Sequence, residues 1–290
     1  MKEVVIISGK GGTGKTSFTA AMSELFSDRV MADCDVDAAN LNLVLNAEIT
    51  ETFEFVSGHR AAVDPAKCVA CGRCRDVCRY DAISPDYVVD GFACEGCGAC
   101  YFLCPVGAVT FEETLCGHYF TGRNAKGQGS TFAELLPGAE NSGKLVMAVR
   151  TKAKEMAEGS GSNIILTDGP PGIGCTVIAS LTGASFIVFV TEPTVSGVHD
   201  LKRVMDLANF FKLPGAVVIN KADLNSAFCD EIQQLCEERG FGLLGLIPYE
   251  PLISQAQRQA RTILSHAPDC PASMAIREIH QKLIKRLETD

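Results

Sequence analysis

Three features that would tie a protein to a membrane or to nucleic acid are missing from this sequence. No run approaches the roughly 18 consecutive apolar residues that cross a bilayer. The amino-terminal apolar run, Val4 to Ile7, is too short for the core of a signal peptide. Positive charge is not in excess, because the 290 residues carry a formal net charge of −9, and this argues against general binding to nucleic acid or acidic membranes. We therefore expect a cytosolic protein.

Cysteine, by contrast, is abundant and unevenly distributed. Thiols stay reduced in the cytosol, so the 14 cysteines are interpreted first as metal ligands and only second as disulfides. Eight of them fall between Cys68 and Cys104, in two segments that both follow C-x2-C-x2-C-x3-C. A shift of 26 residues superimposes CVACGRCRDVC on CEGCGACYFLC and also maps Ala82-Ile83 onto Ala108-Val109. The segment is therefore an internal repeat.

The spacing within each half of the repeat suits an iron–sulfur cluster. Three cysteines at this pitch can each hold one iron of a cubane, and the fourth reaches the neighbouring cluster. The segment resembles a bacterial-type ferredoxin with two 4Fe–4S clusters, although Arg79 stands where the second half has the usual Pro105. Zinc bound by four thiolates is the alternative, but zinc sites usually pair CxxC units across a longer gap. The resemblance assigns one cluster to Cys68, Cys71, Cys74 and Cys104, and the other to Cys94, Cys97, Cys100 and Cys78.

Outside the repeat, continuous Val/Ile runs alternate with helical stretches. This pattern predicts an α/β fold with a doubly wound, mostly parallel sheet. The expected strands are Glu3–Ser8, 29–35, Asn163–Asp168, Ser185–Glu192, Gly215–Lys221 and Phe241–Pro248. The expected helices are Lys15–Phe26, Gly143–Ala157, Val198–Phe211 and Ala227–Arg239. The alternation breaks between about residues 60 and 142.

A phosphate-binding motif opens the chain. GKGGTGKTS fits G-x4-G-K-[ST] and lies between an expected strand and an expected helix. Glycines let backbone amides close around phosphate oxygens, and the helix amino terminus adds a favourable dipole. Lys15 is expected to contact the β- and γ-phosphates and Thr16 to bind Mg²⁺. The predicted ATP-binding residues here are Gly9, Lys10, Gly11, Gly12, Thr13, Gly14, Lys15, Thr16 and Ser17.

The second lysine, Lys10, gives the motif the form KGGTGKT. This resembles the deviant Walker A of the MinD/ParA/Mrp ATPases, which is also similar to that of the nitrogenase iron protein. The resemblance implies that Lys10 crosses a dimer interface to the partner's nucleotide. It therefore implies a nucleotide-dependent homodimer, or a heterodimer with a related ATPase.

Further segments carry the same resemblance. DCDVDAANLNLVL is similar to switch I, and this resemblance implies that Asp35 orients the attacking water. The implied catalytic residues are therefore Lys10, Lys15 and Asp35. TDGPPGIG resembles Walker B running into switch II, with Asp168 near Mg²⁺. INKAD and LIPYEPLISQA resemble the segments around the adenine, with Asn220 contacting the base and Pro248 in the closing loop.

The resemblance covers nearly the whole chain outside the repeat and implies a domain plan. We expect a discontinuous P-loop ATPase domain at residues 1–60 and 143–290. A small α+β ferredoxin-like insert with two clusters is expected at residues 61–112, and a connecting loop or hairpin at residues 113–142. The implied protein is a MinD-superfamily ATPase that carries an inserted ferredoxin domain.

Three functions remain open from the sequence. The first is a nucleotide-switched iron–sulfur ATPase that serves metallocluster assembly or low-potential electron delivery, with a metalloprotein or redox client. The second is a MinD/ParA-like positioning or division ATPase whose clusters are structural or sense redox state. The third is an electron carrier with vestigial ATP binding, against which the intact Lys15, Thr16, Asp35 and Asp168 argue.

Two further features lie outside the motifs. Cys175 lies seven residues after Asp168, near a helix amino terminus that favours a thiolate. It is either a buried thiol or, as the resemblance to the nitrogenase iron protein implies from the same offset, a metal ligand shared by two subunits. The last helix carries Ile276, Ile279, Leu283 and Leu287 at helical spacing. We expect it to dock on the sheet, the alternative being a basic membrane-binding tail like that of MinD. No nucleic-acid partner is expected.

Overall fold

A computed structural model of the chain describes residues 1–37, 39–139 and 141–289. Three residues lie outside this description: Ala38 in the predicted switch I, Glu140 in the predicted connector, and Asp290. Within the described residues, no helix combines the length and apolar character that a bilayer span requires.

The described strands form one nine-stranded sheet, in the order β3-β4-β5-β2-β6-β1-β7-β8-β9. The strands from β2 to β9 in this order follow the predicted plan, because β2–β6, β6–β1, β1–β7, β7–β8 and β8–β9 all pair in parallel. The strand bounds are β1 (Lys2–Ser8), β2 (Val30–Asp33), β3 (Glu48–Val63), β4 (Val109–Arg123), β5 (Gly129–Leu135), β6 (Ile164–Pro171), β7 (Phe186–Thr191), β8 (Gly215–Asn220) and β9 (Gly242–Ile247).

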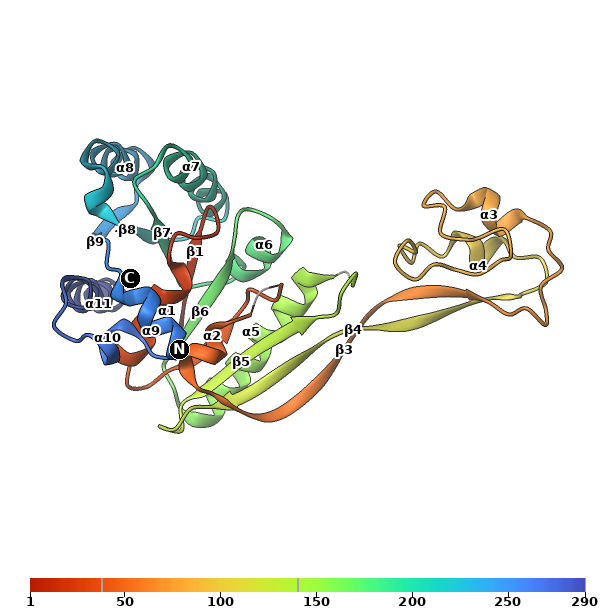
Figure 1. Ribbon diagram of the computed structural model, residues 1–290, viewed down its shortest axis with the longest axis horizontal. Coiled ribbons are helices and arrows are strands. Elements are labelled where there is room, and N and C mark those ends of the chain that lie inside the picture. The colour runs from red at the N-terminus through yellow and green to blue at the C-terminus, as the bar shows by residue number, and fades with distance from the viewer. Residues whose placement is uncertain (38, 140, 290) are drawn as a thin grey trace. The chain divides into compact units, whose positions relative to one another are not determined.

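Helices cover both faces of the parallel strands, as a doubly wound sheet requires (Figure 1). One core joins the sheet to α1 (Lys15–Leu25), α10 (Ile263–His266) and α11 (Pro271–Thr289). The other core joins it to α6 (Cys175–Leu181), α7 (Val195–Phe210) and α8 (Ser226–Arg239). The remaining helices are α2 (Leu41–Leu45), α3 (Arg73–Val77), α4 (Ala99–Leu103), α5 (Ser142–Ser160) and α9 (Leu252–Arg258), with a 3-10 turn at Ala222–Leu224.

Every strand and helix expected from the sequence is present, and the predicted docking of the last helix is confirmed. Ile276, Ile279, Leu283 and Leu287 of α11 are buried in the same core as strand residues of β1, β7 and β8. The long strand β3 was not predicted, whereas β4 and β5 are neighbours in the sheet where a connecting loop or hairpin was expected at residues 113–142. They lie in the region where the alternation of strands and helices breaks down, and β3 is exposed along much of its length.

The chain divides into two compact units. The first comprises Met1–Thr52, Tyr119–Glu134 and Ser142–Asp290, and contains the parallel strands and the phosphate-binding motif. The second comprises Phe53–His118 and Leu135–Asn141, and contains all eight cysteines of the repeat. The expected insert, residues 61–112, lies inside the second unit, which extends further on both sides because β3 and β4 continue past those limits.

The second unit is small and its core is built around the repeat. Residues of β3 and β4 pack there with the short helices α3 and α4. The pairs Ala82-Ile83 and Ala108-Val109, which the repeat superimposes, are all buried. The buried core residues are Ala61, Cys74, Ile83, Cys100 and Val109.

The phosphate-binding loop approaches α7 closely at Gly9. A Cβ at Gly9 would lie 2.5 Å from the backbone carbonyl carbon and oxygen of Asp200, closer than real Cβ atoms approach. A Cβ at Gly11, two residues away in the same loop, would meet nothing within 4 Å. Only glycine at position 9 therefore permits the observed contact between the β1–α1 loop and α7.

Replacing Gly9 by alanine is expected to lower the free energy of unfolding by about 1–3 kcal/mol, because the backbone of α7 must shift to accommodate the methyl group. Gly11→Ala is the matched control and should change it by less than about 0.5 kcal/mol. Urea unfolding without nucleotide measures both. Equal effects of the two substitutions would show that the close approach at Gly9 does not constrain the loop.

Candidate functional site

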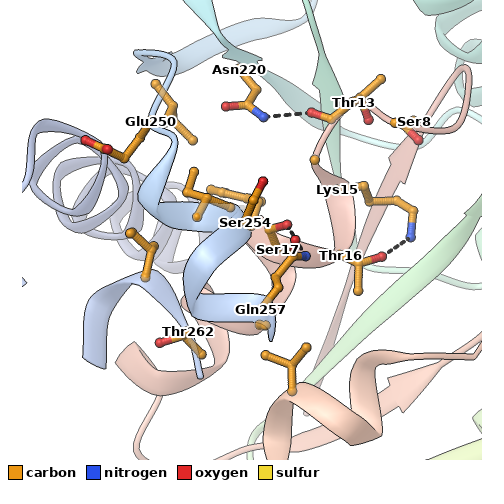
Figure 2. A pocket seen from close by; sticks show the side chains of 18 of the residues that line it. Ser8, Thr13, Lys15, Thr16, Ser17, Asn220, Glu250, Ser254, Gln257 and Thr262 are labelled. Carbon is orange, nitrogen blue, oxygen red and sulfur yellow. Dashed lines mark hydrogen bonds between the residues drawn. The ribbon is translucent and has the colours of Figure 1, made fainter. Parts of the chain in front are cut away.

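A cavity of about 520 Å³ lies over the loop between β1 and α1 (Figure 2). The loop residues Gly11 to Ser17 line it, together with Asp35 from the segment after β2 and Asn220 from the end of β8. Residues of α9 form the opposite wall, where Gln257 donates a hydrogen bond from Nε2 to Ser17 Oγ at 2.6 Å. The volume falls within the roughly 300–1,000 Å³ typical of ligand pockets.

A buried ion pair lies at the base of this cavity. Lys15 Nζ is 2.8 Å from Asp168 Oδ1, and the two residues are 5% and 1% exposed. Asp168 also accepts hydrogen bonds from the hydroxyls of Thr16 at 2.8 Å and Thr19 at 2.7 Å. Asp168 therefore joins β6 to the first turns of α1, and it holds Lys15 and Thr16 where a phosphate and its Mg²⁺ would bind.

A second buried carboxylate, Asp33 at the end of β2, lies beside Asp168. Burial and the negative charge of Asp168 raise the pKa of Asp33 to about 7, although Lys15 opposes the shift. Its two oxygens accept hydrogen bonds from the backbone N–H groups of Asp35 and Leu41, both at 3.1 Å. Asp33 thus fixes the backbone at two points of the segment that resembles switch I, at Asp35 and at Leu41. The sequence did not predict this role.

Asp35 lines the cavity as predicted for a residue that faces the nucleotide. Burial raises the pKa of Asp35, while the nearby Lys15 ammonium lowers it. A carboxylate with a raised pKa in a cleft is the kind of group that accepts or positions a proton. The geometry therefore places a potential water-orienting group across the cavity from the phosphate loop.

The loop itself contains an unsatisfied buried donor. The Thr13 hydroxyl is buried and has no hydrogen-bond partner among the residues that the structure describes. Asn220 donates from Nδ2 to the Thr13 carbonyl at 2.8 Å, and a Cβ at Gly14, whose φ is +86°, would lie 2.3 Å from this nitrogen. Buried polar groups are normally paired, so Thr13 indicates a missing oxygen ligand such as a phosphate.

The donor set fits Mg-ATP. A helix amino terminus, a buried lysine and glycines that leave the backbone open suit phosphate. The oxygens of Thr16 and Asp168 suit Mg²⁺, which prefers hard oxygen ligands. Of the predicted contacts, Gly9, Lys10 and Pro248 do not line the cavity, although Ile247 and Tyr249 on either side of Pro248 do.

Lys10 does not line this cavity and forms its own ion pair. Its Nζ is 2.7 Å from Glu192 Oε1 and donates to Ser196 Oγ at 2.7 Å. Lys221 Nζ binds the other oxygen of Glu192 at 2.8 Å. Burial alone would raise the pKa of Glu192, but the two ammonium groups together lower it. Sequence reasoning noted the segment around Glu192 but did not identify this pairing.

The cysteines of the repeat gather around two separate hollows in the second unit. One hollow is lined by Cys68, Cys71, Cys74 and Cys104, and the other by Cys78, Cys94, Cys97 and Cys100. The other lining residues are largely apolar. These are the two sets that the ferredoxin resemblance implies, each with one cysteine from the other half of the repeat.

Backbone hydrogen bonds explain the exchange between the halves. Asp64 N–H donates to the Ala108 carbonyl at 2.7 Å, and Asp90 N–H donates to the Ala82 carbonyl at 2.7 Å. Asp64 and Asp90 are equivalent positions of the repeat, 26 residues apart, and so are Ala82 and Ala108. The two bonds are therefore the same contact made once in each direction between the halves. The start of each half therefore pairs with the end of the other, which carries each fourth cysteine to the opposite set.

The thiol environment suits a ligand that binds as a thiolate. Burial alone would raise the pKa of Cys104, but several backbone N–H groups, including that of Ala108 at 3.2 Å, together lower it. Within the described residues, no group of three or more side chains is arranged to bind a single metal ion. A cubane would take one thiolate on each of its four irons, and each hollow is lined by four thiols.

Of the six cysteines outside the repeat, Cys34, Cys116, Cys229 and Cys236 are buried and Cys270 is half-buried. Cys229 and Cys236 pack on one face of α8. Cys175 is exposed at the first residue of α6, so its interpretation as a buried thiol is wrong. Exposure leaves the alternative of a shared metal ligand as a prediction.

Together the sheet and the phosphate loop define a P-loop nucleotide-binding protein. The family model described as the CobQ/CobB/MinD/ParA nucleotide binding domain matches residues 4–263. The chain belongs to this family of MinD/ParA-type P-loop ATPases.

Relatives extend over almost the whole chain. An uncharacterized protein of Methanocaldococcus jannaschii is 31% identical over 284 residues, covering 97% of this chain and 96% of that protein. An uncharacterized ATP-binding protein of the same organism is 22% identical and covers 97% of this chain and 87% of its own length. The septum site-determining protein MinD of Pyrococcus horikoshii, complexed with Mg-ADP, has the same fold, with a TM-score of 0.59, 17% identity and coverage of 99% and 97% of the two chains.

The two lysines of the loop should affect nucleotide binding differently. Lys15→Ala is expected to weaken Mg-ADP binding by about 10- to 100-fold, because it removes a charge-assisted hydrogen bond inside the cavity. Lys10→Ala should weaken it by less than about threefold, because Lys10 lies outside the cavity and a screened charge contributes little. Isothermal titration calorimetry of both variants measures this. Comparable losses would contradict the placement of Lys15 inside the cavity and of Lys10 outside it.

Proposed function

We propose that the protein is a nucleotide-switched iron–sulfur ATPase that delivers electrons or clusters to a metalloprotein client. The observation that carries this proposal is the presence, in one chain, of a P-loop cavity and two hollows lined by four cysteines each. When bound, 4Fe–4S clusters supply one-electron transfer. A positioning ATPase needs the P-loop cavity but does not need the two hollows lined by cysteines.

The residues proposed to act on ATP are those that the structure gathers at the cavity. Lys15 contacts the phosphates, Thr16 and Asp168 bind Mg²⁺, and Asp35 orients the attacking water. Asp33 positions switch I through its two backbone hydrogen bonds. The structure of a protein with this fold in complex with Mg-ADP supports nucleotide binding.

Lys10 gives the switch its proposed dimeric form. In the single chain Lys10 is paired with Glu192, so it must leave this carboxylate to reach a partner's nucleotide. Lys221 remains on Glu192 after that movement, which limits the free-energy cost of releasing Lys10. ATP would therefore favour a dimer by offering Lys10 a more negative partner than Glu192.

The residues proposed to hold the clusters do so as two interlocked sets. Each set needs one cysteine from the other half, so neither half can complete a set alone. The exposed Cys71 and Cys97, one in each set, bring each site to the surface of the unit. A client could therefore approach either site without unfolding the second unit.

Iron and acid-labile sulfide in anaerobically purified protein test this proposal. We expect about eight atoms of each per chain, because each of the two sets holds one cubane. Cys104→Ser should lower both contents by about half, since it removes one ligand of only one set. ATPase activity should depend on whether the clusters are oxidised or reduced.

Cys175→Ser is the matched control, because it removes an exposed thiol outside the repeat and should leave the iron content near that of the parent. Zinc in place of iron, or iron that survives Cys104→Ser in full, would contradict the proposed sets. ATPase activity that ignores cluster oxidation state, together with nucleotide-dependent sedimentation on lipid or DNA, would favour the positioning ATPase instead.

A further inference from the structure

A hollow of about 220 Å³ lies in the first unit, next to the nucleotide cavity but separate from it. Three connections meet there: the link between α1 and β2, the turn between β4 and β5, and the link between α9 and α10. Val44, Arg261 and Thr262 line both this hollow and the nucleotide cavity. A smaller hollow of about 160 Å³ shares Arg29, Lys126 and Gln128 with it.

Arg29 is the unusual residue of this hollow. It is only 3% exposed, and its Nε donates to the Ser23 carbonyl at 2.9 Å. Its Nη1 and Nη2 donate no hydrogen bond and form no salt bridge among the residues that the structure describes, and Glu24 acts on the charge without an ion-pair contact. These nitrogens are not among the buried polar atoms that lack a partner, so they reach the solvent of the hollow and are open to an anion.

Other positive side chains line the same hollow. Lys126, on the turn between β4 and β5, and Arg261, on the link between α9 and α10, are exposed at its edge. Glu24 is the one carboxylate among the lining residues. The hollow thus carries a local charge near +2 in a chain whose net charge is −9.

The walls of the hollow are tied together by side-chain hydrogen bonds. Gln128 Nε2 donates to the Ser27 carbonyl at 3.0 Å and so attaches the β4–β5 turn to the α1–β2 link. Asn46 Nδ2 donates to the Ala260 carbonyl at 2.9 Å and attaches the end of α2 to the α9–α10 link. The hollow is therefore built into the fold around Arg29.

We propose that this hollow binds a small anion that carries a phosphoryl group. A planar guanidinium presents paired donors that match the oxygens of phosphate, and a phosphomonoester is close to a dianion at neutral pH. The negative charge of such a phosphomonoester would balance the excess positive charge of the hollow. The volume is below the roughly 300 Å³ of pockets for drug-sized ligands, which restricts the ligand to a small molecule.

The protonation chemistry of Arg29 agrees with this assignment. Burial lowers the pKa of Arg29 to about 10, and Glu24 only partly opposes the shift. A bound anion would stabilise the charged guanidinium and reverse that effect.

Calorimetric titration of inorganic phosphate into the full chain tests the proposal. Saturating Mg-ADP occupies the nucleotide cavity, and ionic strength is held constant with chloride. We expect saturable binding that Arg29→Gln and Lys126→Gln each weaken by about tenfold, because each removes a charged donor to phosphate. Arg277→Gln removes an exposed charge from α11, far from the lining residues in sequence, and should leave the affinity within about twofold.

Glycerol 3-phosphate in place of phosphate distinguishes the source of the phosphoryl group. Tighter binding than phosphate identifies a phosphorylated metabolite as the ligand, whereas weaker binding identifies free phosphate. Either result supports a phosphoryl site, provided that both substitutions weaken it.

Thermal unfolding separates this role from a structural one. Phosphate should raise the melting temperature of the parent but not of Arg29→Gln. In phosphate-free buffer Arg29→Gln should change the melting temperature only slightly, because the substitution removes the hydrogen bond to the Ser23 carbonyl together with a charge that burial disfavours. If Arg29→Gln fails to fold, Lys126→Gln on the exposed turn decides the titration. Absence of saturable binding, or binding that survives both substitutions and therefore occurs at the phosphate loop, would overturn the proposal.

Discussion

The ion pair between Lys15 and Asp168 is the interaction on which the nucleotide site depends. Both residues are almost fully buried, so each needs the other to offset the cost of leaving water. Asp168 in turn binds the hydroxyls of Thr16 and Thr19, and its charge raises the pKa of Asp33. The carboxyl ends of β2 and β6 thereby set the positions of the phosphate loop and of the segment that resembles switch I. A bound Mg-nucleotide would exchange this internal pairing for contacts to phosphate and metal.

The sequence predicted the parts of the fold whose signals are local. Continuous apolar runs gave the parallel strands, and the ferredoxin resemblance, carried by the spacing of Cys68 to Cys104, implied the two sets of cysteines that line separate hollows. β3 escaped prediction because it is exposed over much of its length and pairs with β4, a segment distant in sequence. The pairing of Lys10 and Lys221 with Glu192, and the isolation of Arg29, depend on tertiary contacts that no local pattern encodes.

The two units place different chemical demands on the same chain. The first needs hard oxygen ligands, buried charges and backbone amides for phosphate and Mg²⁺. The second needs thiolates, apolar walls and backbone N–H donors to sulfur, as around Cys104. Joining them in one chain is useful only if nucleotide state changes the behaviour of the cysteine sites. In the proposed function Lys10 offers a route to such a change, since it would have to leave Glu192 in order to engage a second subunit.

Electron paramagnetic resonance of the reduced protein, recorded with and without Mg-ATP, tests the central claim most directly. The account predicts signals from reduced 4Fe–4S clusters whose shape or midpoint potential changes when Mg-ATP binds, and no such change in Lys15→Ala. Reduced protein without an iron–sulfur signal, or with a signal that Mg-ATP leaves unaltered, would contradict the coupling between the nucleotide cavity and the cysteine unit.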